Sequence, residues 1–125
     1  MKYVIHAYEQ SYGGLHGIDT TLVIETDNYL DVVDEACCAS RGVMSSYAFI
    51  EENLREQACF YCGVEEYEEE DEDLDRAYED AVEENIAYSI WVVKEECPYT
   101  VREIDQMIAD DLESFVEEFC IIFMD

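Results

Sequence analysis

Two short apolar runs near the start of the chain are separated by a glycine-rich break. Residues 2–9 (KYVIHAYE) and 20–26 (TTLVIET) are rich in β-branched and aromatic side chains, which favour extended strands. Gly13, Gly14 and Gly17 lie between these runs and are typical of a loop. The pattern therefore predicts two strands joined by a loop that is too long for a tight two-residue turn.

Between Asn28 and Ala58 the apolar positions recur at spacings of three and four residues, which predicts a helix. The positions that share its apolar face are Leu30, Val33, Cys37, Ser40, Val43, Met44, Tyr47, Ile50 and Leu54. Gly42 lies in the middle and costs about 1 kcal/mol relative to alanine in a helix interior. We therefore expect a kink or break near Arg41 and Gly42, and the pattern fits one bent helix as well as two helices.

After a connection at residues 59–63, the acidic segment 65–84 also has a helical pattern. Its apolar positions recur at spacings of seven, four and four and are Tyr67, Leu74, Tyr78 and Val82. The other faces of such a helix would be almost wholly acidic, and like charges would weaken it by a few tenths of a kcal/mol per pair. We expect a helix about 30 Å long whose formation depends on docking of the narrow apolar stripe.

The last third of the chain contains the strongest strand pattern and another clear helix pattern. Residues 86–93 (IAYSIWVV) are apolar on both faces, which predicts a central strand that is covered on each side. After a turn around Pro98, Thr100 and Glu103 match a capping box that begins a helix. The core-facing positions of that helix are Ile104, Met107, Ile108, Leu112, Phe115 and Phe119. Residues 121–124 fit a short edge strand or the end of the helix.

This order of elements predicts an α+β fold. We expect a small sheet of three to four antiparallel or mixed strands, covered by a long kinked helix, an acidic helix and a C-terminal helix. Of the 125 residues, 50% are hydrophobic and 13% are aromatic. Because this length and composition suit one hydrophobic core, residues 1–125 are expected to form a single domain.

Charge is the most unusual property of the chain, since its net charge at pH 7 is -27. Residues 65–84 contain thirteen carboxylates and a single cation, Arg76. Over a length of about 30 Å, duplex DNA carries roughly eighteen phosphate charges, so a helical segment 65–84 would approach that density to within a factor of about one and a half. Such a surface disfavours nucleic acid, anionic membranes and acidic substrates as partners and favours a basic cleft or a cation.

Other features of the sequence bear on location and redox state. No run approaches the roughly 18 to 20 apolar residues of a membrane span, and the start of the chain lacks the pattern of a secretion signal. We therefore expect a cytoplasmic protein. The six cysteines are interpreted mostly as small buried side chains in a reducing compartment rather than as a disulfide framework, and they are Cys37, Cys38, Cys59, Cys62, Cys97 and Cys120.

Metal binding has two partial signals. Cys59 and Cys62 have a spacing found in zinc sites, but a structural zinc needs about four ligands. The other donors, His6, His16, Cys97 and Cys120, are isolated from this pair in the sequence. Asp71, Asp73 and Asp75 resemble the start of a calcium loop, whose sixth and twelfth positions are here Arg76 and Val82 instead of glycine and glutamate. We therefore predict no bound cofactor, and the sequence leaves open whether Cys59 and Cys62 bind metal.

Catalytic patterns are weak, which favours a protein without enzymatic activity. Ser45 and Ser46 lie in a helical stretch without a nucleophile motif, and His6 lies in a strand, where a hydrogen-bonded core histidine is the common outcome. Gly13, Gly14 and Gly17 do not form a phosphate-binding fingerprint before a helix.

The short acidic chain and its run E-E-Y-E-E-E-D-E-D-L-D resemble the DNA-mimic inhibitors of phages and mobile elements, which include anti-CRISPR and anti-restriction proteins. The resemblance is one of composition and pattern, and it implies no particular topology because members of that class have unrelated folds. It implies occupation of the basic nucleic-acid cleft of a host defence protein, such as a Cas effector or a restriction enzyme. Such an inhibitor acts in the host cytoplasm when a phage encodes it, and it does not itself bind nucleic acid.

The carboxylates expected to stand in for phosphates and pair with lysines and arginines of that cleft lie in the acidic segment. These predicted partner-binding residues are Glu65, Glu66, Glu68, Glu69, Glu70, Asp71, Glu72, Asp73, Asp75, Glu79, Asp80 and Glu83. Two other interpretations fit the same composition. An acidic adaptor or chaperone would hold a basic protein without blocking a defined cleft, and a halophilic cytosol would favour acidic surfaces in general. A homodimer that extends the charged surface also fits the sequence.

Overall fold

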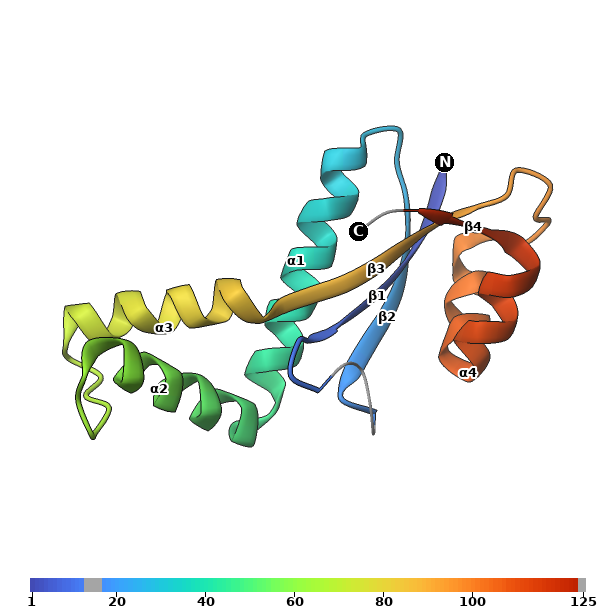
Figure 1. Ribbon diagram of the computed structural model, residues 1–125. Coiled ribbons are helices and arrows are strands. Elements are labelled where there is room, and N and C mark those ends of the chain that lie inside the picture. Colours follow the sequence, from blue (N-terminus) through green and yellow to red (C-terminus); the bar gives the residue numbers. More distant parts are fainter. Residues whose placement is uncertain (13–16, 124–125) are drawn as a thin grey trace.

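The four strands of the computed structural model form one open antiparallel sheet in the order β2-β1-β3-β4 (Figure 1). The structure describes residues 1–12 and 17–123. Within them the strands are β1 (Lys2–Glu9), β2 (Asp19–Glu25), β3 (Ile86–Val93) and β4 (Cys120–Phe123). The helices are α1 (Tyr29–Ser46), α2 (Ala48–Cys62), α3 (Glu72–Asn85) and α4 (Val101–Phe119). The predicted α+β fold is confirmed.

The strand predictions agree closely with the sheet. β1 and β3 have the predicted bounds, and β2 begins and ends one residue earlier than predicted. β3 is central, because it pairs with β1 on one side and with β4 on the other. Of the two alternatives for residues 121–124, the structure has the edge strand, β4, which begins one residue earlier than predicted. Position 124 and the first two loop glycines lie outside the described residues.

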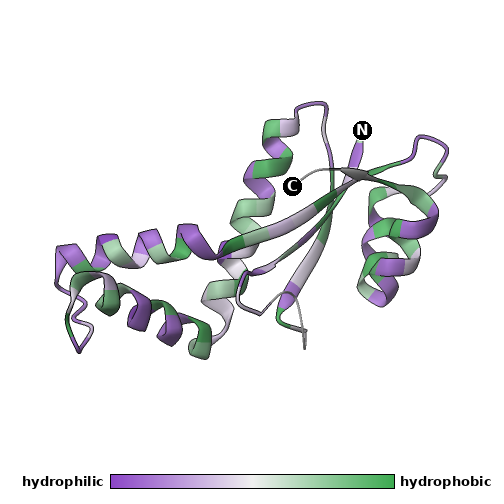
Figure 2. Cartoon of the chain, in the orientation of Figure 1, coloured by the Kyte–Doolittle hydropathy of each residue, from purple (hydrophilic) through white to green (hydrophobic). Residues whose placement is uncertain are grey.

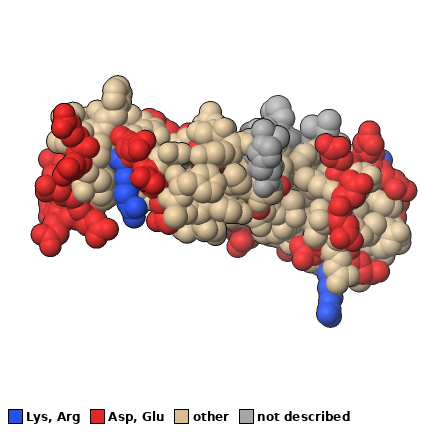
Figure 3. Space-filling view, turned by 90° about the horizontal axis from the view of Figure 1, so that it is seen from below, with Lys and Arg blue, Asp and Glu red and all other residues tan. Residues whose placement is uncertain are grey.

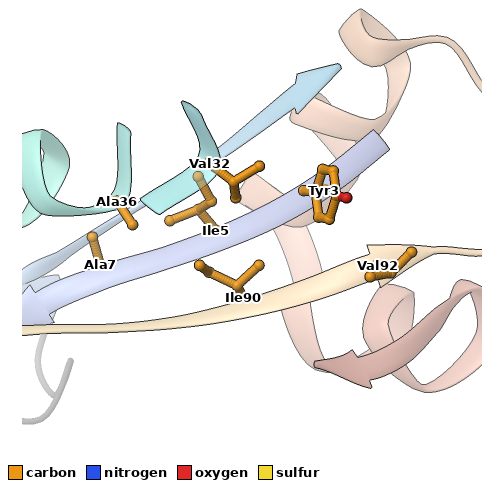
Figure 4. Close-up of a cluster of buried hydrophobic side chains, with 7 residues drawn as sticks. All are labelled: Tyr3, Ile5, Ala7, Val32, Ala36, Ile90 and Val92. Carbon is orange, nitrogen blue, oxygen red and sulfur yellow. The ribbon is translucent and has the colours of Figure 1, made fainter. Parts of the chain in front are cut away.

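One face of the sheet is covered by α1. The strand alternation places Tyr3, Ile5 and Ala7 on this face, and Ile90 of β3 lies opposite Ile5 in the register. Figure 4 shows these side chains pointing toward α1, where Val32 and Ala36 complete a buried cluster. The predicted apolar face is wrong near the start of this helix, since Leu30 is exposed and Val32 is fully buried.

The opposite face is covered by α4, which begins with the predicted capping box. The Thr100 hydroxyl oxygen accepts the Glu103 backbone N–H at 3.2 Å, and the Glu103 carboxylate accepts the Thr100 N–H at 3.1 Å. Ile104 and Ile108 are buried against Val4 of β1. This side of the sheet therefore has its own hydrophobic cluster, as the apolar pattern of β3 on both faces requires.

The predicted C-terminal helix is confirmed as α4, but this helix turns back on itself at Asp111, which the sequence pattern did not predict. This residue has non-helical dihedral angles, with φ -156° and ψ 88°, and its carboxylate accepts the backbone N–H of Ser114 at 3.1 Å. The rings of Tyr99 and Phe119, which flank the two ends of α4, are 5.4 Å apart. A straight helix of that length would separate its ends by roughly 28 Å. Asp111 therefore acts as the N-cap of a second half-helix that returns toward β4 (Figure 1).

The segment 28–58 forms two helices, and the break lies at Tyr47 instead of near Gly42. Tyr47 has an extended backbone, with φ -127° and ψ 117°. Its hydroxyl donates to the Gly17 carbonyl at 3.1 Å and its ring packs against Phe49. Gly42 remains inside α1 because nothing forces a bend there, and these tertiary contacts of Tyr47 stop the helix instead.

The predicted connection at residues 59–63 is also wrong for its first four positions. α2 continues to Cys62, and Gly63 ends it in the left-handed conformation, with φ 67°. The Val64 N–H donates to the Cys59 carbonyl at 3.0 Å, and the Gly63 N–H donates to the Phe60 carbonyl at 3.2 Å. These bonds satisfy carbonyls at the end of the helix, as a glycine C-cap normally does.

α2 and α3 form an antiparallel hairpin that extends away from the sheet (Figure 1). We call residues 48–85 the arm, and the sheet with α1 and α4 the body. Figure 2 shows hydrophilic and hydrophobic stretches alternating along both helices of the arm. Leu54 and Ala81 belong to a cluster at its base, whereas Ala58 and Leu74 belong to a cluster nearer its tip. In the part of the chain that the structure describes, no helix has the length and apolar character needed to span a membrane.

Candidate partner-binding surface on the arm

Acidic side chains are concentrated at the two ends of the molecule. Residues 48–85 of the arm contain sixteen acidic and two basic residues. Figure 3 shows carboxylates gathered over the end formed by the arm and over the opposite end formed by α4, with mostly uncharged surface between them. The arm therefore presents a negative surface that is physically separated from the sheet.

The predicted acidic helix is shorter than expected, because helix begins only at Glu72. Asp71 is its N-cap, and its carboxylate accepts the backbone N–H groups of Asp73 at 2.9 Å and Leu74 at 3.3 Å. Residues 65–71 form a loop at the tip of the arm. Tyr67 is the only large apolar side chain of this loop, and its other residues are acidic. One such side chain buries too little apolar surface to stabilise a further helical turn.

The exposed face of α3 carries a row of carboxylates. Leu74, Ala77, Ala81 and Val82 are buried and Tyr78 is half-buried, so the opposite side of the helix faces solvent. Six of the predicted residues lie there with exposed side chains, and they are Glu72, Asp73, Asp75, Glu79, Asp80 and Glu83. Glu84, a seventh acid of α3, is exposed beside them. The structure thus brings half of the predicted set together on one helix.

The charge density of this row resembles that of one nucleic-acid strand more than that of a duplex. The fourteen residues of α3 span about 21 Å. With seven acids and Arg76, the net spacing is roughly one negative charge per 3.5 Å of helix. One strand of DNA carries about one charge per 3.4 Å, whereas the duplex carries one per about 1.7 Å. The predicted match over a 30 Å rod is therefore replaced by a match over a shorter length to a single strand.

The other predicted residues do not extend the row. Five of them are exposed in the tip loop and are Glu65, Glu66, Glu68, Glu69 and Glu70. Asp71 is partly buried, and its carboxylate is engaged by the start of α3. The loop acids add negative potential at the tip of the arm without a regular spacing.

Three acids of the row contact cations of the chain itself. Arg41 of α1 pairs with Glu83 and lies 3.5 Å from Glu79, measured from guanidinium nitrogen to carboxylate oxygen. Arg76 pairs with Asp73 at 2.9 Å. All of these carboxylates are more than half exposed, and exposed pairs contribute only about 0–1 kcal/mol each. Separating Arg41 and Arg76 from these carboxylates therefore costs little free energy.

Two tyrosines of the arm donate hydrogen bonds to two of its carboxylates. The Tyr67 hydroxyl donates to Asp75 at 3.2 Å, and its ring packs against Tyr78 with the centroids 6.1 Å apart. The Tyr61 hydroxyl donates to Glu84. The pKa of Tyr61 is raised chiefly by this hydrogen bond, and the pKa values of Tyr67 and Tyr78 are raised chiefly by burial. The raised pKa values favour the protonated phenols, and Tyr61 and Tyr67 act as donors to the acidic surface.

An apolar feature on the outer side of α2 was not predicted from the sequence. Phe60 is 82% exposed, and Tyr61 and Val64 are also exposed. A cavity of about 610 Å³ lies beside them, and its lining includes Phe60, Val64, Arg55 and Tyr67. Phe60 lies off the stripe formed by Ile50, Leu54 and Ala58, and this departure from the helical period is the sequence signal that marks it. The surface of the arm therefore presents exposed apolar side chains as well as carboxylates.

The residues considered for metal binding are dispersed in the structure. Cys59 and Cys62 occupy the last turn of α2, where Cys59 is buried. Cys97 and Cys120 lie together in the cluster under α4, and burial raises the pKa of the Cys120 thiol to about 11. His6 contacts Asp19, and position 16 lies outside the described residues. In residues 1–12 and 17–123, no three His, Cys, Asp or Glu side chains are grouped to hold a metal ion.

Among the six cysteines, only half have the predicted burial. Cys59, Cys97 and Cys120 are buried, Cys37 and Cys62 are half-buried, and Cys38 is exposed. All six are free thiols. Loss of solvent around Cys62, with Asp71 and Asp73 nearby, raises the pKa of its thiol, which disfavours the thiolate that a metal requires.

The chain was compared with models of protein families, with curated proteins and with solved structures, and no family model, curated protein or solved structure matched it.

Proposed function

We propose that this protein is a nucleic-acid mimic of the anti-CRISPR or anti-restriction type, which inhibits a nucleic-acid-binding defence protein of a host. The carboxylate row on α3 occupies the basic cleft in which a Cas effector or a restriction enzyme normally holds nucleic acid. Its carboxylates accept hydrogen bonds from arginines and lysines that otherwise contact phosphates. The protein itself carries out no reaction in this proposal and requires no cofactor.

The observation that carries the proposal is the placement of the row on a projecting arm. Its seven acids lie on a single helix, and the helix extends away from the sheet instead of packing over it. A projecting rod can enter a cleft that a flat acidic surface cannot enter. Its charge spacing of roughly one per 3.5 Å suits a cleft that grips one strand, such as the path of a guide or a displaced strand.

Charge reversal at two matched places tests the proposal. The arm variant carries Glu72→Lys, Asp75→Lys, Glu79→Lys and Asp80→Lys, and the control variant carries Glu95→Lys, Asp105→Lys, Asp110→Lys and Glu118→Lys. Both sets are exposed and change the net charge equally, but the control residues lie in or next to α4. Wild type and both variants are used at low salt to capture proteins from a lysate of the organism that the inhibitor is meant to act on.

We expect wild type and the control variant to capture a nucleic-acid-binding protein, and the arm variant to lose it. Added DNA or RNA should release the captured protein, and its nuclease activity should be inhibited only by the two proteins that bind it. The assignment of the row would be refuted if the arm variant captured the protein as well as wild type does, or if the arm variant still inhibited its nuclease activity. Circular dichroism of each variant establishes that its helices are retained.

An acidic adaptor for a basic protein is the alternative, and the exposed Phe60 favours it. An apolar side chain beside acids suits a partner that offers both a basic surface and an apolar depression. Under this alternative the captured protein remains bound when DNA or RNA is added. Release by nucleic acid therefore separates the two functions.

A further inference from the structure

We infer that the cleft between the sheet and the second half of α4 is a binding site for an organic cation of the alkylammonium or guanidinium class. The cleft lies at the opposite side of the sheet from α1 and does not involve the arm. It is independent of the proposed function, since none of its residues belongs to the carboxylate row. Its volume is about 480 Å³, which is within the range of roughly 300–1,000 Å³ that is common for small-ligand sites.

The cleft exists because α4 turns back at Asp111. The first half of α4 packs over Val4 and the end of β3, and the second half leaves part of the sheet surface uncovered. His6 and Tyr8 of β1, with Ser89 and Trp91 of β3, form the floor of the cleft. Glu113 and Glu117, together with two aliphatic side chains of the same half-helix, form its wall.

The aromatic floor suits a cation that has an apolar body. Trp91 and Tyr8 are only half-buried, so part of each side chain is accessible from the cleft. An aromatic face attracts alkylammonium and guanidinium groups through its quadrupole, and tryptophan is the strongest of the aromatic residues in this respect. A small hydrated metal ion gains less from such a floor, because it would have to lose water to contact it.

The carboxylates of the wall lack a cation in the described part of the chain. Glu113 and Glu117 are four residues apart on one helix and are exposed, and no salt bridge joins either of them to a lysine or an arginine there. Like charges at this spacing repel each other and weaken the helix, so a bound cation between them would relieve the repulsion. Two negative groups over an aromatic floor define the sign of the ligand.

His6, at the floor of the cleft, has its own acidic partner within the protein. Its Nε2 lies 2.6 Å from an oxygen of Asp19, and both side chains are mostly buried. Its ring packs against Tyr8 with the centroids 5.2 Å apart. This pair fixes the position of Tyr8 at the floor, with the Asp19 carboxylate facing the imidazole.

The only tryptophan of the chain, Trp91, lies in the cleft and provides a specific reporter. We would titrate the full-length protein with tetramethylammonium chloride and with an acetylated, amidated Ala-Arg-Ala peptide, following Trp91 fluorescence at constant ionic strength. Sodium chloride at the same ionic strength is the control for general screening. A saturable change with either organic cation, absent with sodium, is the expected result, and tighter binding of one probe distinguishes a free ammonium ligand from an arginine side chain of a protein.

Paired variants locate the response. Glu113→Gln with Glu117→Gln should weaken binding of the better probe by about tenfold, because each change removes one exposed ion pair worth on the order of a factor of a few and the two losses multiply. Asp105→Asn with Glu118→Gln removes the same charge from exposed positions outside the cleft and should leave the affinity unchanged. Absence of saturation with both probes, or equal weakening by the two double variants, would overturn the inference.

Discussion

The body and the arm bury the same types of apolar side chain, but the body buries more of them and the arm carries the denser charge. In the body, both faces of the sheet are covered, and Val4, Ile5 and Ile104 have no exposed surface. In the arm, α2 and α3 share a narrow contact whose outer cluster consists of small residues around Leu74. The dense carboxylates lie where the apolar contact is thinnest, so their repulsion acts on the arm and spares the sheet.

The largest expected effect compares one buried side chain in each region. Ile90→Ala in the central strand should lower the global free energy of unfolding by about 2–5 kcal/mol, because it leaves a cavity between the sheet and α1. Leu74→Ala in the arm should mainly favour local opening of α2 from α3, since that contact belongs to the arm alone. Denaturant unfolding measures the first change, and native-state hydrogen exchange of the α3 amides measures the second.

Exchange of the β1 and β3 amides is the internal control for this comparison. In the Leu74→Ala variant, they should keep their wild-type protection while the α3 amides exchange faster. If the strand amides lose protection to the same extent as those of α3, the arm and the body unfold as one cooperative unit and the comparison fails.

The contrast between body and arm also determines what the sequence could predict. β1 and β3 were predicted with their correct bounds because their β-branched and aromatic runs fit a sheet whatever surrounds them. The break at Tyr47 could not be predicted, because it depends on the distant Gly17 carbonyl. The reversal at Asp111 was hidden because Ile108, Leu112 and Phe115 continue a helical spacing across it.

The candidate site was predictable in composition but not in geometry. Exposure of the acids followed from their charge, whereas the length of α3 followed from where the apolar contact with α2 ends. The contacts of Arg41 with Glu79 and Glu83 join residues that are 38 and 42 positions apart, so no local pattern announces them. The cleft next to Trp91 likewise required the unpredicted reversal of α4.

An intermediate effect is expected from alkaline pH, which should weaken the arm through its tyrosines. The pKa values of Tyr61, Tyr67 and Tyr78 are raised in the folded state. The stability that this provides is fully present below the unfolded pKa of about 10 and is lost as the pH rises through the folded pKa values. Ionisation would also replace the donors to Glu84 and Asp75 by negative charges. Helix loss followed by circular dichroism as the pH is raised measures the effect.

A variant with Tyr61→Phe, Tyr67→Phe and Tyr78→Phe isolates these three groups from the other side chains of the protein. It should lose less arm helix than wild type on moving above pH ~10, although it is less stable at neutral pH because the hydrogen bonds to the carboxylates are gone. An alkaline response identical to that of wild type would show that other groups cause the loss.

The smallest expected effect concerns Arg41, the residue through which the body partly neutralises the arm. Arg41→Gln should lower the free energy of unfolding by less than about 1 kcal/mol, because its ion pairs with Glu79 and Glu83 are exposed. It should nevertheless strengthen binding of an oligoarginine peptide, measured by calorimetry at low salt. The reason is that Arg41 no longer competes with the peptide for Glu79 and Glu83. Arg102→Gln makes the same charge change at the exposed start of α4. If Arg102→Gln strengthens peptide binding equally, net charge governs the affinity and the row on α3 has no special role, whereas an effect confined to Arg41→Gln places the binding surface on the arm.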